Sequence, residues 1–304
     1  MKGSGRPRVS LCIPAYQAER YLQQTLDSCL AQDYPDFEVV VIDNNSSDGT
    51  REILETVKDE RVRVIRNETT LPVVENWNLA VRMSRGEFVK VVCADDILEP
   101  DCVAAQSAVL GDSPDVALVS SRIDFIDAEG QLLRRARGLG GIVGRQSGER
   151  VVRQLVRTGS YPVGPAVAVM FRRADFDRTG GFGSDLVLTS DIDLWVRLLR
   201  CGDFFGVAKT LGALRFTLGS LTSSMSTRSQ LAQRSEFVRR LAADPGWNVT
   251  VLDRVLGHFN RYDMQLRLSL LYKLSAFRSR ARRRHGLGPA PDADRVMAAQ
   301  SRAG

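Results

Sequence analysis

The chain has 304 residues, of which 43% are hydrophobic and 26% charged, the composition of an ordinary globular protein. Its formal net charge is +6, but much of the positive excess lies in the arginine-rich segment 278–284, so the total charge does not indicate a nucleic acid partner. No apolar run reaches the roughly 20 residues that span a bilayer, and the N-terminus lacks the apolar core of a signal peptide. We therefore expect neither an integral membrane protein nor a secreted one, and we predict a cytoplasmic location.

The five cysteines show neither a CxxC pair nor the close, even spacing of a disulfide framework. Three of them lie in apolar runs. We therefore predict reduced thiols in a protein core. The cysteines are Cys12, Cys29, Cys93, Cys102 and Cys201.

Short apolar strands alternate with helical patterns over the first 120 residues. The first strand, 9–13, ends at Pro14, and apolar residues at helical spacing follow from Tyr21 to Leu30. The same step recurs with strands at 37–42, 61–65, 88–92 and 116–120 and helices at 50–58, 73–83 and 100–110. This alternation predicts an α/β domain whose mainly parallel sheet is covered on both faces, with ligands beyond the carboxyl ends of the strands.

The rest of the chain is less regular. Residues 124–148 are rich in glycine and arginine, which predicts a hairpin or a mobile loop. A strand at 166–171, a helix at 192–199 and short strands near 204–207 and 210–216 then complete the domain. Only helical patterns follow Ser226, so we assign residues 1–222 to the α/β domain and residues 223–304 to a helical C-terminal region with a flexible basic tail.

Polar residues follow the second strand directly. Asp43 lies where the sheet is expected to open, so its carboxylate could accept a hydrogen bond from the imide N–H of uracil or from a ribose hydroxyl. The next segment, 46–49, reads Ser-Ser-Asp-Gly and is explained by a turn whose side chains cap the following helix. We therefore assign the nucleoside contact to Asp43.

Two adjacent carboxylates, Asp95 and Asp96, follow the fourth strand. They repel each other unless a cation or hydrogen-bond donors lie between them. Mg²⁺ or Mn²⁺ is commonly held by one or two protein carboxylates together with phosphate oxygens, so a diphosphate leaving group would complete such a site. We predict Mn²⁺ or Mg²⁺ as the cofactor; the alternative is that one of the two carboxylates caps the helix near Pro100.

Seven segments, taken together and in order, resemble glycosyltransferase family 2 over about Val9 to Ser223. They are Ile13-Pro14-Ala15-Tyr16, Val41 to Thr50, Asn76-Trp77-Asn78, Gly86 to Lys90, Ala94 to Asp101, Gly180-Gly181-Phe182 and Asp191 to Arg197. The resemblance implies a GT-A fold, a nucleotide-diphospho-sugar donor and inversion at the anomeric carbon.

The resemblance also implies roles for single residues. Asp96 would bind the metal, Asp95 would lie near the ribose or the donor sugar, and Asp191 would be the catalytic base. Tyr16 would lie against the nucleobase. The full set of implied nucleotide-binding residues is Pro14, Ala15, Tyr16, Asp43, Asn78 and Asp95.

The sequence departs from the family pattern at two positions. Related sequences commonly have Glu-Asp where this one has Ser190-Asp191, and they often have a histidine at the position of Thr217. Metal affinity would then depend more on the donor diphosphate. Arg215, Thr217 and Ser220 could contact that diphosphate, although Arg215 could equally be a surface residue of an edge strand. The two histidines, His258 and His285, lie in the C-terminal region, and we interpret them as surface or packing residues.

The segment 190–193 contains two acids, only one of which can face an acceptor. Ser190 and Asp193 have the spacing of a capping box, which gives Asp193 a structural role. Asp191 would then be the first helical residue, where the helix dipole keeps its carboxylate ionised. This favours Asp191 as the general base.

Apolar residues between Val255 and Phe277 recur at near-helical spacing and are followed by the arginine-rich segment. A helix docked on the catalytic domain through these residues explains the pattern. The basic end could contact anionic lipid at the inner face of the membrane, but a solvated basic tail is the simpler interpretation.

We therefore predict an inverting glycosyltransferase that moves a sugar from a UDP-sugar to an acceptor hydroxyl; a dTDP-sugar presents the same imide edge. The acceptor could be a saccharide, a lipid-linked molecule or a small molecule, contacted by loops 138–148 and 160–164. One alternative is a sugar-nucleotide pyrophosphorylase, which would need a glycine-rich loop where this chain has Pro14 to Gln17. The other is a non-catalytic nucleotide-sugar sensor, which would not need Asp191.

Overall fold

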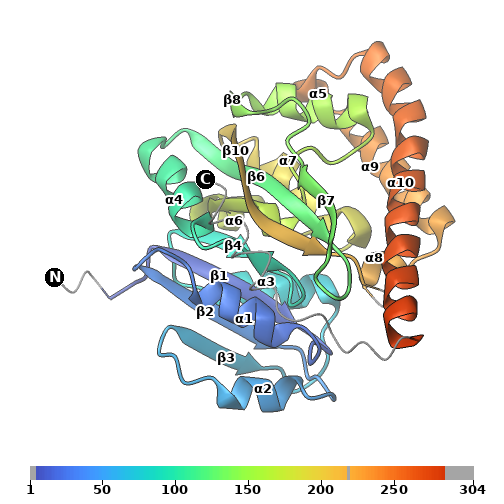
Figure 1. Cartoon of the computed structure of the whole chain (residues 1–304). Helices are drawn as coiled ribbons and strands as arrows, with labels where there is room; N and C mark the ends of the chain where they lie inside the picture. The colour runs from blue at the N-terminus through green and yellow to red at the C-terminus, as the bar shows by residue number, and fades with distance from the viewer. Residues whose placement is uncertain (1–4, 218–219, 285–304) are drawn as a thin grey trace.

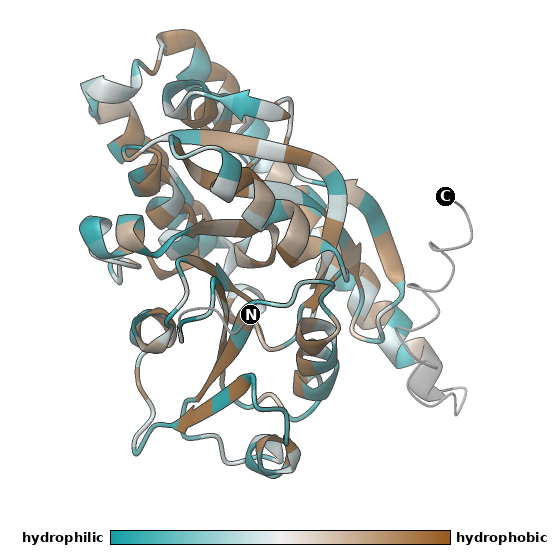
Figure 2. Cartoon of the chain, turned by 90° about the vertical axis from the view of Figure 1, so that its left-hand side faces the viewer, coloured by the Kyte–Doolittle hydropathy of each residue, from teal (hydrophilic) through white to brown (hydrophobic). Residues whose placement is uncertain are grey.

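The computed structural model describes residues 5–217 and 220–284. Its centre is a twisted sheet with helices on both faces (Figures 1 and 2). The strands are β1 (Val9–Ala15), β2 (Phe37–Asp43), β3 (Val62–Arg66), β4 (Phe88–Val91), β5 (Ile97–Leu98), β6 (Val116–Ile126), β7 (Leu132–Arg137), β8 (Gly144–Gln146), β9 (Val169–Arg172) and β10 (Asp203–Arg215). The helices are α1 (Leu22–Leu30), α2 (Thr50–Thr56), α3 (Val73–Met83), α4 (Cys102–Asp112), α5 (Gly148–Thr158), α6 (Arg173–Thr179), α7 (Ser190–Leu198), α8 (Leu221–Ser224), α9 (Thr227–Ala243) and α10 (Val251–Arg284), with single 3₁₀ turns at Ala166–Ala168, Val187–Thr189 and Pro245–Trp247.

Within the described residues the sheet has ten strands in the order β3-β2-β1-β4-β9-β6-β10-β5, with β7 paired to β6 and β8 to β10. β1, β2, β3 and β4 are parallel neighbours, and β6 and β10 are parallel to each other. β9 lies antiparallel between β4 and β6. The predicted α/β fold with a mainly parallel sheet is therefore confirmed, and the carboxyl ends of β1, β2 and β4 meet at one edge.

The central strands are apolar because helices cover both of their faces. Every residue of β1, β2 and β4 is buried, whereas the edge strand β3 is partly exposed. In Figure 2 the strands at the centre are largely hydrophobic. This core fixes the strand ends that carry the candidate site.

Several elements differ from the prediction. The segment 124–148 contains the predicted hairpin, because β7 pairs with the end of β6. The two short strands expected near 204–216 form one strand, β10, whose register against β6 shifts between Val207 and Ala213. The strand expected at 166–171 begins only at Val169, after a 3₁₀ turn. The short strand β5 and the helices α5 and α6 were not predicted.

The C-terminal helix α10 docks through a face that the sequence analysis did not identify. Asp253, near its start, forms ion pairs with Arg153 (3.0 Å) and Arg157 (3.1 Å) of α5. Gly257 lies so close to α5 that an added Cβ would be 1.9 Å from the carbonyl oxygen of Val156. Most of the apolar residues expected to pack inward are exposed instead, whereas Leu271 is half-buried, so the expectation was wrong for most of that face.

Three further predictions meet the structure at the C-terminal end. The domain boundary at residue 222 falls within α8 and stays a prediction. His258 is exposed on α10, as expected, while His285 and the predicted flexible tail lie outside the described residues. Among residues 5–217 and 220–284, no helix combines the length and apolar character needed to cross a membrane.

Candidate active site

The edge formed by the carboxyl ends of the parallel strands holds Asp43 in a fixed position. Strand pairing places Asp43 of β2 between Ala15 of β1 and Arg66 of β3. The Asp43 carboxylate is 1% exposed; its Oδ1 accepts from the backbone N–H of Ser46 (3.0 Å) and its Oδ2 from the Arg66 guanidinium. Sequence reasoning missed Arg66, although its position at the end of the third strand is the same signal that identified Asp43.

Pro14 and Ala15 are buried at the end of β1, and Tyr16, the next residue, is 53% exposed. Gln17 then turns the chain with a φ of 49°, and its backbone N–H donates to Ser46 Oγ (3.1 Å). In the turn 46–49, Asp48 Oδ1 accepts from the N–H of Thr50 (3.1 Å) at the start of α2, as the turn explanation expects, although the cap residue itself is Gly49. The Tyr16 ring is left available for stacking, as its predicted role requires.

Asn78 lies on α3 and is engaged by the backbone of another segment. Its Nδ2 donates to the carbonyl of Phe182 (3.0 Å), and its Oδ1 accepts from the N–H of Phe182 (2.8 Å). This pairing ties α3 to the loop before α7. It competes with the nucleotide contact that the resemblance implied for Asn78.

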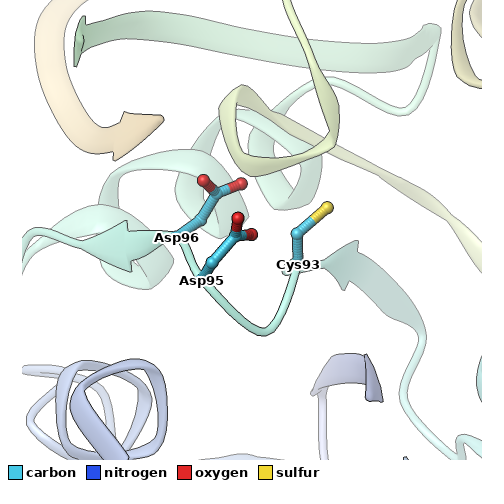
Figure 3. Close-up of side chains that lie close together, drawn as sticks. All are labelled: Cys93, Asp95 and Asp96. Atoms are coloured by element: carbon cyan, nitrogen blue, oxygen red, sulfur yellow. The ribbon is translucent and has the colours of Figure 1, made fainter. Parts of the chain in front are cut away.

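The turn between β4 and β5 brings three potential ligand groups together. The Sγ of Cys93 and carboxylate oxygens of Asp95 and Asp96 all lie within 4.8 Å of one another, and the three side chains point to the same side of the turn (Figure 3). Asp96 is 1% exposed; its Oδ1 accepts from the N–H of Arg215 (3.1 Å), while its Oδ2 is buried with no hydrogen-bond partner among the described residues. Cys93 thus lies in the candidate site and is only partly buried. Cys201 is also partly exposed, so the core prediction was wrong for both, whereas Cys12, Cys29 and Cys102 are buried as expected.

The electrostatics of this turn favour a bound cation. Burial, and then the charge of Asp95, raise the pKa of Asp96 well above its ordinary value, and burial also raises the pKa of Asp95. A divalent cation would offset the repulsion and give the unpartnered Asp96 Oδ2 a ligand role, since Mg²⁺ and Mn²⁺ favour oxygen donors. The residues present therefore fit such a metal. The capping alternative was wrong: the residue that precedes α4 is Asp101, whose side chain makes no cap hydrogen bond, and the N–H of Val103 in the first turn donates to Gln32 Oε1 (3.0 Å).

Arg215 contacts the turn that carries Cys93, Asp95 and Asp96, which we call the acidic turn. It is 4% exposed, donates from Nε to the carbonyl of Asp95 (2.9 Å) and lies with its guanidinium carbon 4.6 Å from the centre of the Tyr21 ring. The idea that Arg215 is a surface residue of an edge strand was wrong. Its guanidinium contacts the backbone of Asp95 and its backbone N–H contacts the Asp96 carboxylate, so it positions Asp95 and Asp96.

Thr217 and Ser220 follow β10 along the same side. The Thr217 side chain hydrogen-bonds Asp95 and lowers the pKa of that carboxyl. Thr217 therefore lies at the acidic turn, where the resemblance expects a histidine. Ser220 instead caps α8, accepting from the N–H of Ser223 (3.3 Å), which gives its hydroxyl a structural role.

Asp191 lies near the start of α7, but the predicted capping box was wrong. The helix begins at Ser190, whose Oγ is buried without a hydrogen-bond partner in the described part of the chain, and Asp193 pairs with Arg197 (2.7 Å) instead. Asp191 is therefore the second helical residue. The reason is that the 3₁₀ turn Val187–Thr189 runs directly into α7 and leaves no extended cap residue.

The Asp191 carboxyl has a perturbed pKa. Burial raises it to about 6, against the opposing effect of the hydrogen bond from the Ile192 N–H (2.8 Å). The sequence analysis expected the helix dipole to keep this carboxylate ionised; desolvation, the largest cause of the shift, instead favours its protonated form. The Asp191 charge in turn raises the pKa of Cys93, so the candidate base and the acidic turn share one site.

Two side chains that the sequence analysis did not name as site residues lie around Asp191. Arg234 of α9 is 4% exposed, forms no ion pair within the described residues and lies with its guanidinium carbon 5.4 Å from the centre of the Tyr161 ring. Its charge lowers the pKa of Asp191. Its Nε and the Tyr161 hydroxyl are both buried and unpartnered in the described structure. Tyr161 belongs to the predicted acceptor loop, whereas nothing in its helical segment distinguished Arg234.

A buried lysine lies beneath the acidic turn. Lys90 of β4 is 0% exposed, and its Nζ donates to Gln106 Oε1 (2.9 Å) and to the carbonyl of Val169 (3.3 Å). Its charge lowers the pKa of Asp96. Lys90 thus places a positive charge near Asp96 from the buried side of the site, where it is not exposed to solvent.

A surface hollow of about 770 Å³ lies at the other end of the sheet, where β1 and β4 begin. It is lined by Arg6, Arg8, Gly86 and Arg173 among others and contains none of the predicted site residues. The strand ends, with their carboxylates, remain the candidate active site.

Comparison with known proteins identifies the family. The profile described as "Glycosyl transferase family 2" matches residues 10–180, more than half of the chain. The chain belongs to this family. It is therefore a glycosyltransferase, with the α/β fold of the GT-A type.

This glycosyltransferase has relatives in several organisms. It is 31% identical to an uncharacterized protein, MT1568, of Mycobacterium tuberculosis over 249 residues, which cover 79% of the chain and 77% of the relative. The chain spans less than half the length of several other curated relatives that it matches.

Solved structures of similar fold carry nucleotide sugars. Staphylococcus aureus TarS 1–349 in complex with UDP-GlcNAc matches with a TM-score of 0.61 and 20% identity, over 77% of this chain and 66% of that one. The mannosyltransferase PcManGT of Pyrobaculum calidifontis, in complex with GDP-Man and Mn²⁺, matches with a TM-score of 0.59 and 20% identity, over 99% and 81% of the two chains. At this identity the likeness establishes the fold.

Proposed function

We propose that this glycosyltransferase moves a sugar from a UDP-sugar to an acceptor hydroxyl with inversion at the anomeric carbon, using a divalent metal and Asp191 as general base. The observation that carries the proposal is the pairing, in one site, of a buried acidic turn with an unpartnered oxygen and a carboxylate whose pKa is raised to about 6. A raised pKa beside a metal-ligand cluster is typical of a catalytic site.

On the donor side, Asp43 and Tyr16 would hold the nucleoside. The Asp43 carboxylate, fixed by Arg66 and Ser46, would accept from the imide N–H of uracil, and the exposed Tyr16 ring would stack on the base. The imide N–H of uracil is the donor assigned to Asp43, and thymine presents the same imide edge. UDP is therefore the preferred nucleotide, with dTDP as the nearest alternative.

Asp96, with Asp95 beside it, would hold Mn²⁺ or Mg²⁺ against the donor diphosphate. When bound, the metal neutralises charge on the leaving diphosphate. Arg215 keeps the backbone of the turn in place through the Asp95 carbonyl, and Thr217 orients the Asp95 carboxylate. The protein thus supplies a rigid acidic turn and excludes water from Asp96.

On the acceptor side, Asp191 would take the proton of the attacking hydroxyl as its oxygen forms the new bond to the anomeric carbon. The bond to the nucleoside diphosphate breaks on the opposite face of the sugar, which inverts the configuration. A base with a pKa near the working pH serves this step well, because it is ionised at neutral pH yet accepts a proton readily. A saccharide, a lipid-linked molecule and a small molecule each offer a suitable hydroxyl as acceptor. The cytoplasmic location of the protein stays a prediction.

Release of nucleoside diphosphate from a panel of UDP-, dTDP- and GDP-sugars, with Mn²⁺ and with Mg²⁺, tests this function. We expect turnover with a UDP-sugar, and loss of that turnover with a chelator. A clear preference for a GDP-sugar would overturn the UDP assignment. Tight binding of nucleotide sugars with neither hydrolysis nor transfer to any acceptor would favour the nucleotide-sugar sensor instead.

A further inference from the structure

Helix α10 has its hydrophobic face turned away from the rest of the protein. Ten apolar side chains on this helix are exposed, and they recur every three or four residues along seven turns. Phe259, about two turns from the start of this series, and Phe277, at its end, are each 70% exposed. We call the set the outer stripe; it comprises Val251, Leu252, Val255, Leu256, Phe259, Tyr262, Leu266, Leu270, Leu274 and Phe277.

The opposite face of α10 docks through buried polar residues, alongside the half-buried Met264, Leu268 and Leu271. Asp253, Gln265 and Ser275 are 1%, 6% and 3% exposed, the reverse of what an ordinary docked helix shows. Besides the Asp253 ion pairs to α5, Gln265 Nε2 donates to Gln230 Oε1 (3.0 Å) and Ser275 Oγ donates to the carbonyl of Phe216 (2.7 Å). Rotating α10 to bury the outer stripe would break all of these contacts. The stripe is therefore a stable feature of the surface.

An apolar surface of this length is unusual on a protein that stays free in water. The helix has 34 residues, which at 1.5 Å per residue make about 50 Å. It runs along the outer side of the molecule, next to α5 and α9 (Figure 1). The surface is thus a long, straight ridge, which suits a flat partner.

The charge around the ridge identifies the kind of partner. The α10 sequence contains nine arginine and lysine residues and two aspartates, a net charge of +7 that exceeds the +6 of the whole chain. One of the two aspartates, Asp253, is neutralised by Arg153 and Arg157. Two copies of this helix would repel each other, whereas an anionic surface would attract it.

A second group of cations lies beside the C-terminal half of α10. Arg278 of α10 donates to the carbonyl of Leu132 (3.2 Å), which places β7 next to the helix. Arg134, Arg135 and Arg137 of β7 are exposed, and none of them forms an ion pair within residues 5–217 and 220–284. Unpaired arginines beside an apolar stripe match the phosphate groups and the acyl region of a lipid surface.

We propose that α10 lies in the plane of an anionic bilayer surface, with the outer stripe in the boundary between headgroups and acyl chains and the flanking cations on the lipid phosphates. The inference goes beyond the proposed function and does not depend on it. A solvated basic tail, the simpler interpretation of the sequence, leaves the outer stripe without an explanation.

The docking would also bring the candidate active site close to the membrane. Tyr272 of α10 packs against Phe216, with 5.0 Å between the ring centres, and Phe216 precedes Thr217 at the acidic turn. Ser275 Oγ donates a hydrogen bond to the carbonyl of the same Phe216. The helix that would contact the lipid therefore also supports the end of β10, next to the site.

Co-sedimentation of the full chain with vesicles tests the proposal without any nucleotide sugar. The two vesicles are phosphatidylcholine alone and an equimolar mixture of phosphatidylcholine and phosphatidylglycerol. The double substitution Phe259→Glu/Leu266→Glu removes apolar contact from the stripe, and Val64→Glu/Met83→Glu adds the same charge at exposed apolar positions on β3 and α3. Each position is exposed, so all variants should fold.

We expect the wild type to bind the mixed vesicles and not the neutral ones. The α10 variant should lose binding by more than about tenfold, since two apolar side chains no longer enter the lipid, while the control variant stays within about twofold. Charge reversal by Lys273→Glu/Arg280→Glu should weaken binding by roughly fivefold or more for each cation removed.

Three outcomes would overturn the proposal. The first is a wild type that does not bind the mixed vesicles. The second is an α10 variant that binds them as well as the wild type does. The third is a wild-type dimer, seen by analytical ultracentrifugation, that the α10 variant dissociates while vesicle binding is absent. That result would show that a second copy of the chain covers the outer stripe.

Discussion

At the scale of single residues, Asp191 combines two opposing demands. Burial raises its pKa to about 6, so the folded protein favours the protonated form more than water does. Catalysis as a base needs the ionised form. Near neutral pH the Asp191 carboxylate is ionised, as catalysis needs, and its burial then lowers the free energy of unfolding.

Asp191→Asn should lower the transfer rate by about 10²–10⁴-fold while UDP-sugar binding stays unchanged, because only the proton acceptor is lost. The wild-type rate should fall as the pH drops below about 6, where Asp191 becomes protonated. Steady-state kinetics over a pH series, with calorimetric binding of the donor, measure both. A soluble Asp191→Asn variant with near-wild-type turnover would rule out Asp191 as the base.

The same substitution should stabilise the protein. Because the folded pKa of Asp191 is raised from 3.8 to about 6, its favourable contribution is complete at low pH and is lost as the pH rises through about 6. Above that pH the ionised group destabilises the fold by up to about 3 kcal/mol, a cost that asparagine does not carry. Thermal unfolding at pH 8 should show a higher Tm for Asp191→Asn than for the wild type, and a much smaller gain at pH 4.

Arg234 should tune this carboxylate from a distance. Its charge lowers the pKa of Asp191, so Arg234→Gln is expected to raise that pKa further and to move the acidic limb of the pH–rate profile to higher pH. Arg239→Gln, an exposed arginine on the same helix, is the matched control. An unchanged limb in Arg234→Gln would show that the two groups are not coupled in solution.

Site residues could be predicted from the sequence where they directly follow a predicted strand. Asp43, Asp95 and Asp96 follow apolar strands directly, so the sequence places them at one edge of the sheet. Arg234 and Tyr161 reach Asp191 only through tertiary packing of α9 and the loop before β9, which no local spacing encodes. The direction of the Asp191 pKa shift was also missed, because burial depends on neighbours far away in the sequence.

At the scale of elements, Arg197, in the last turn of α7, ties this helix to the end of α6 and the residues just after it. It pairs with Asp193 (2.7 Å) and donates to the carbonyls of Thr179 (2.7 Å) and Gly181 (2.7 Å). This arrangement replaces the predicted capping box. Asp193 therefore keeps a structural role, although the group it serves is an arginine side chain.

Arg197→Ala should destabilise the protein by about 2 kcal/mol or more, because two backbone carbonyls lose a charged donor. Asp193→Asn should cost only about 0.5–1 kcal/mol, because the pair is partly exposed and Arg197 keeps its backbone partners. Chemical denaturation of both variants gives the comparison. Equal costs, or a larger loss in Asp193→Asn, would contradict this ranking.

The regular β-α steps were predictable because apolar strands and helical spacing alternate cleanly up to Ser120. The helix α5 was missed because its residues follow a glycine- and arginine-rich stretch that reads as a loop. Two features stabilise α5 as a helix. It packs against α10, and the side chain of its cap residue Ser147 accepts from the N–H of Arg150 (3.3 Å). The orientation of α10 was also missed, since periodicity locates an apolar face without showing which way it points.

At the scale of the whole molecule, the contact of α10 with α5 attaches the C-terminal region to the catalytic domain. Gly257 permits this contact, so Gly257→Ala should force the helices apart and lower the free energy of unfolding by about 1–3 kcal/mol. His258→Ala, at the exposed neighbouring position, should change it by less than about 0.5 kcal/mol. Differential scanning calorimetry compares the two, and an unchanged Tm in Gly257→Ala would mean that α10 does not dock as described.

The central claim is that the buried acidic turn binds a divalent metal together with a nucleoside diphosphate. Calorimetric titration of UDP into the protein, with Mn²⁺ and with a chelator, tests it most directly in the wild type, Asp96→Asn and the control Asp193→Asn. We predict that Mn²⁺ strengthens UDP binding at least about tenfold in the wild type and in Asp193→Asn, and that Asp96→Asn loses this gain. Equal UDP affinity with and without Mn²⁺ in the wild type, or an undiminished Mn²⁺ effect in Asp96→Asn, would contradict the account.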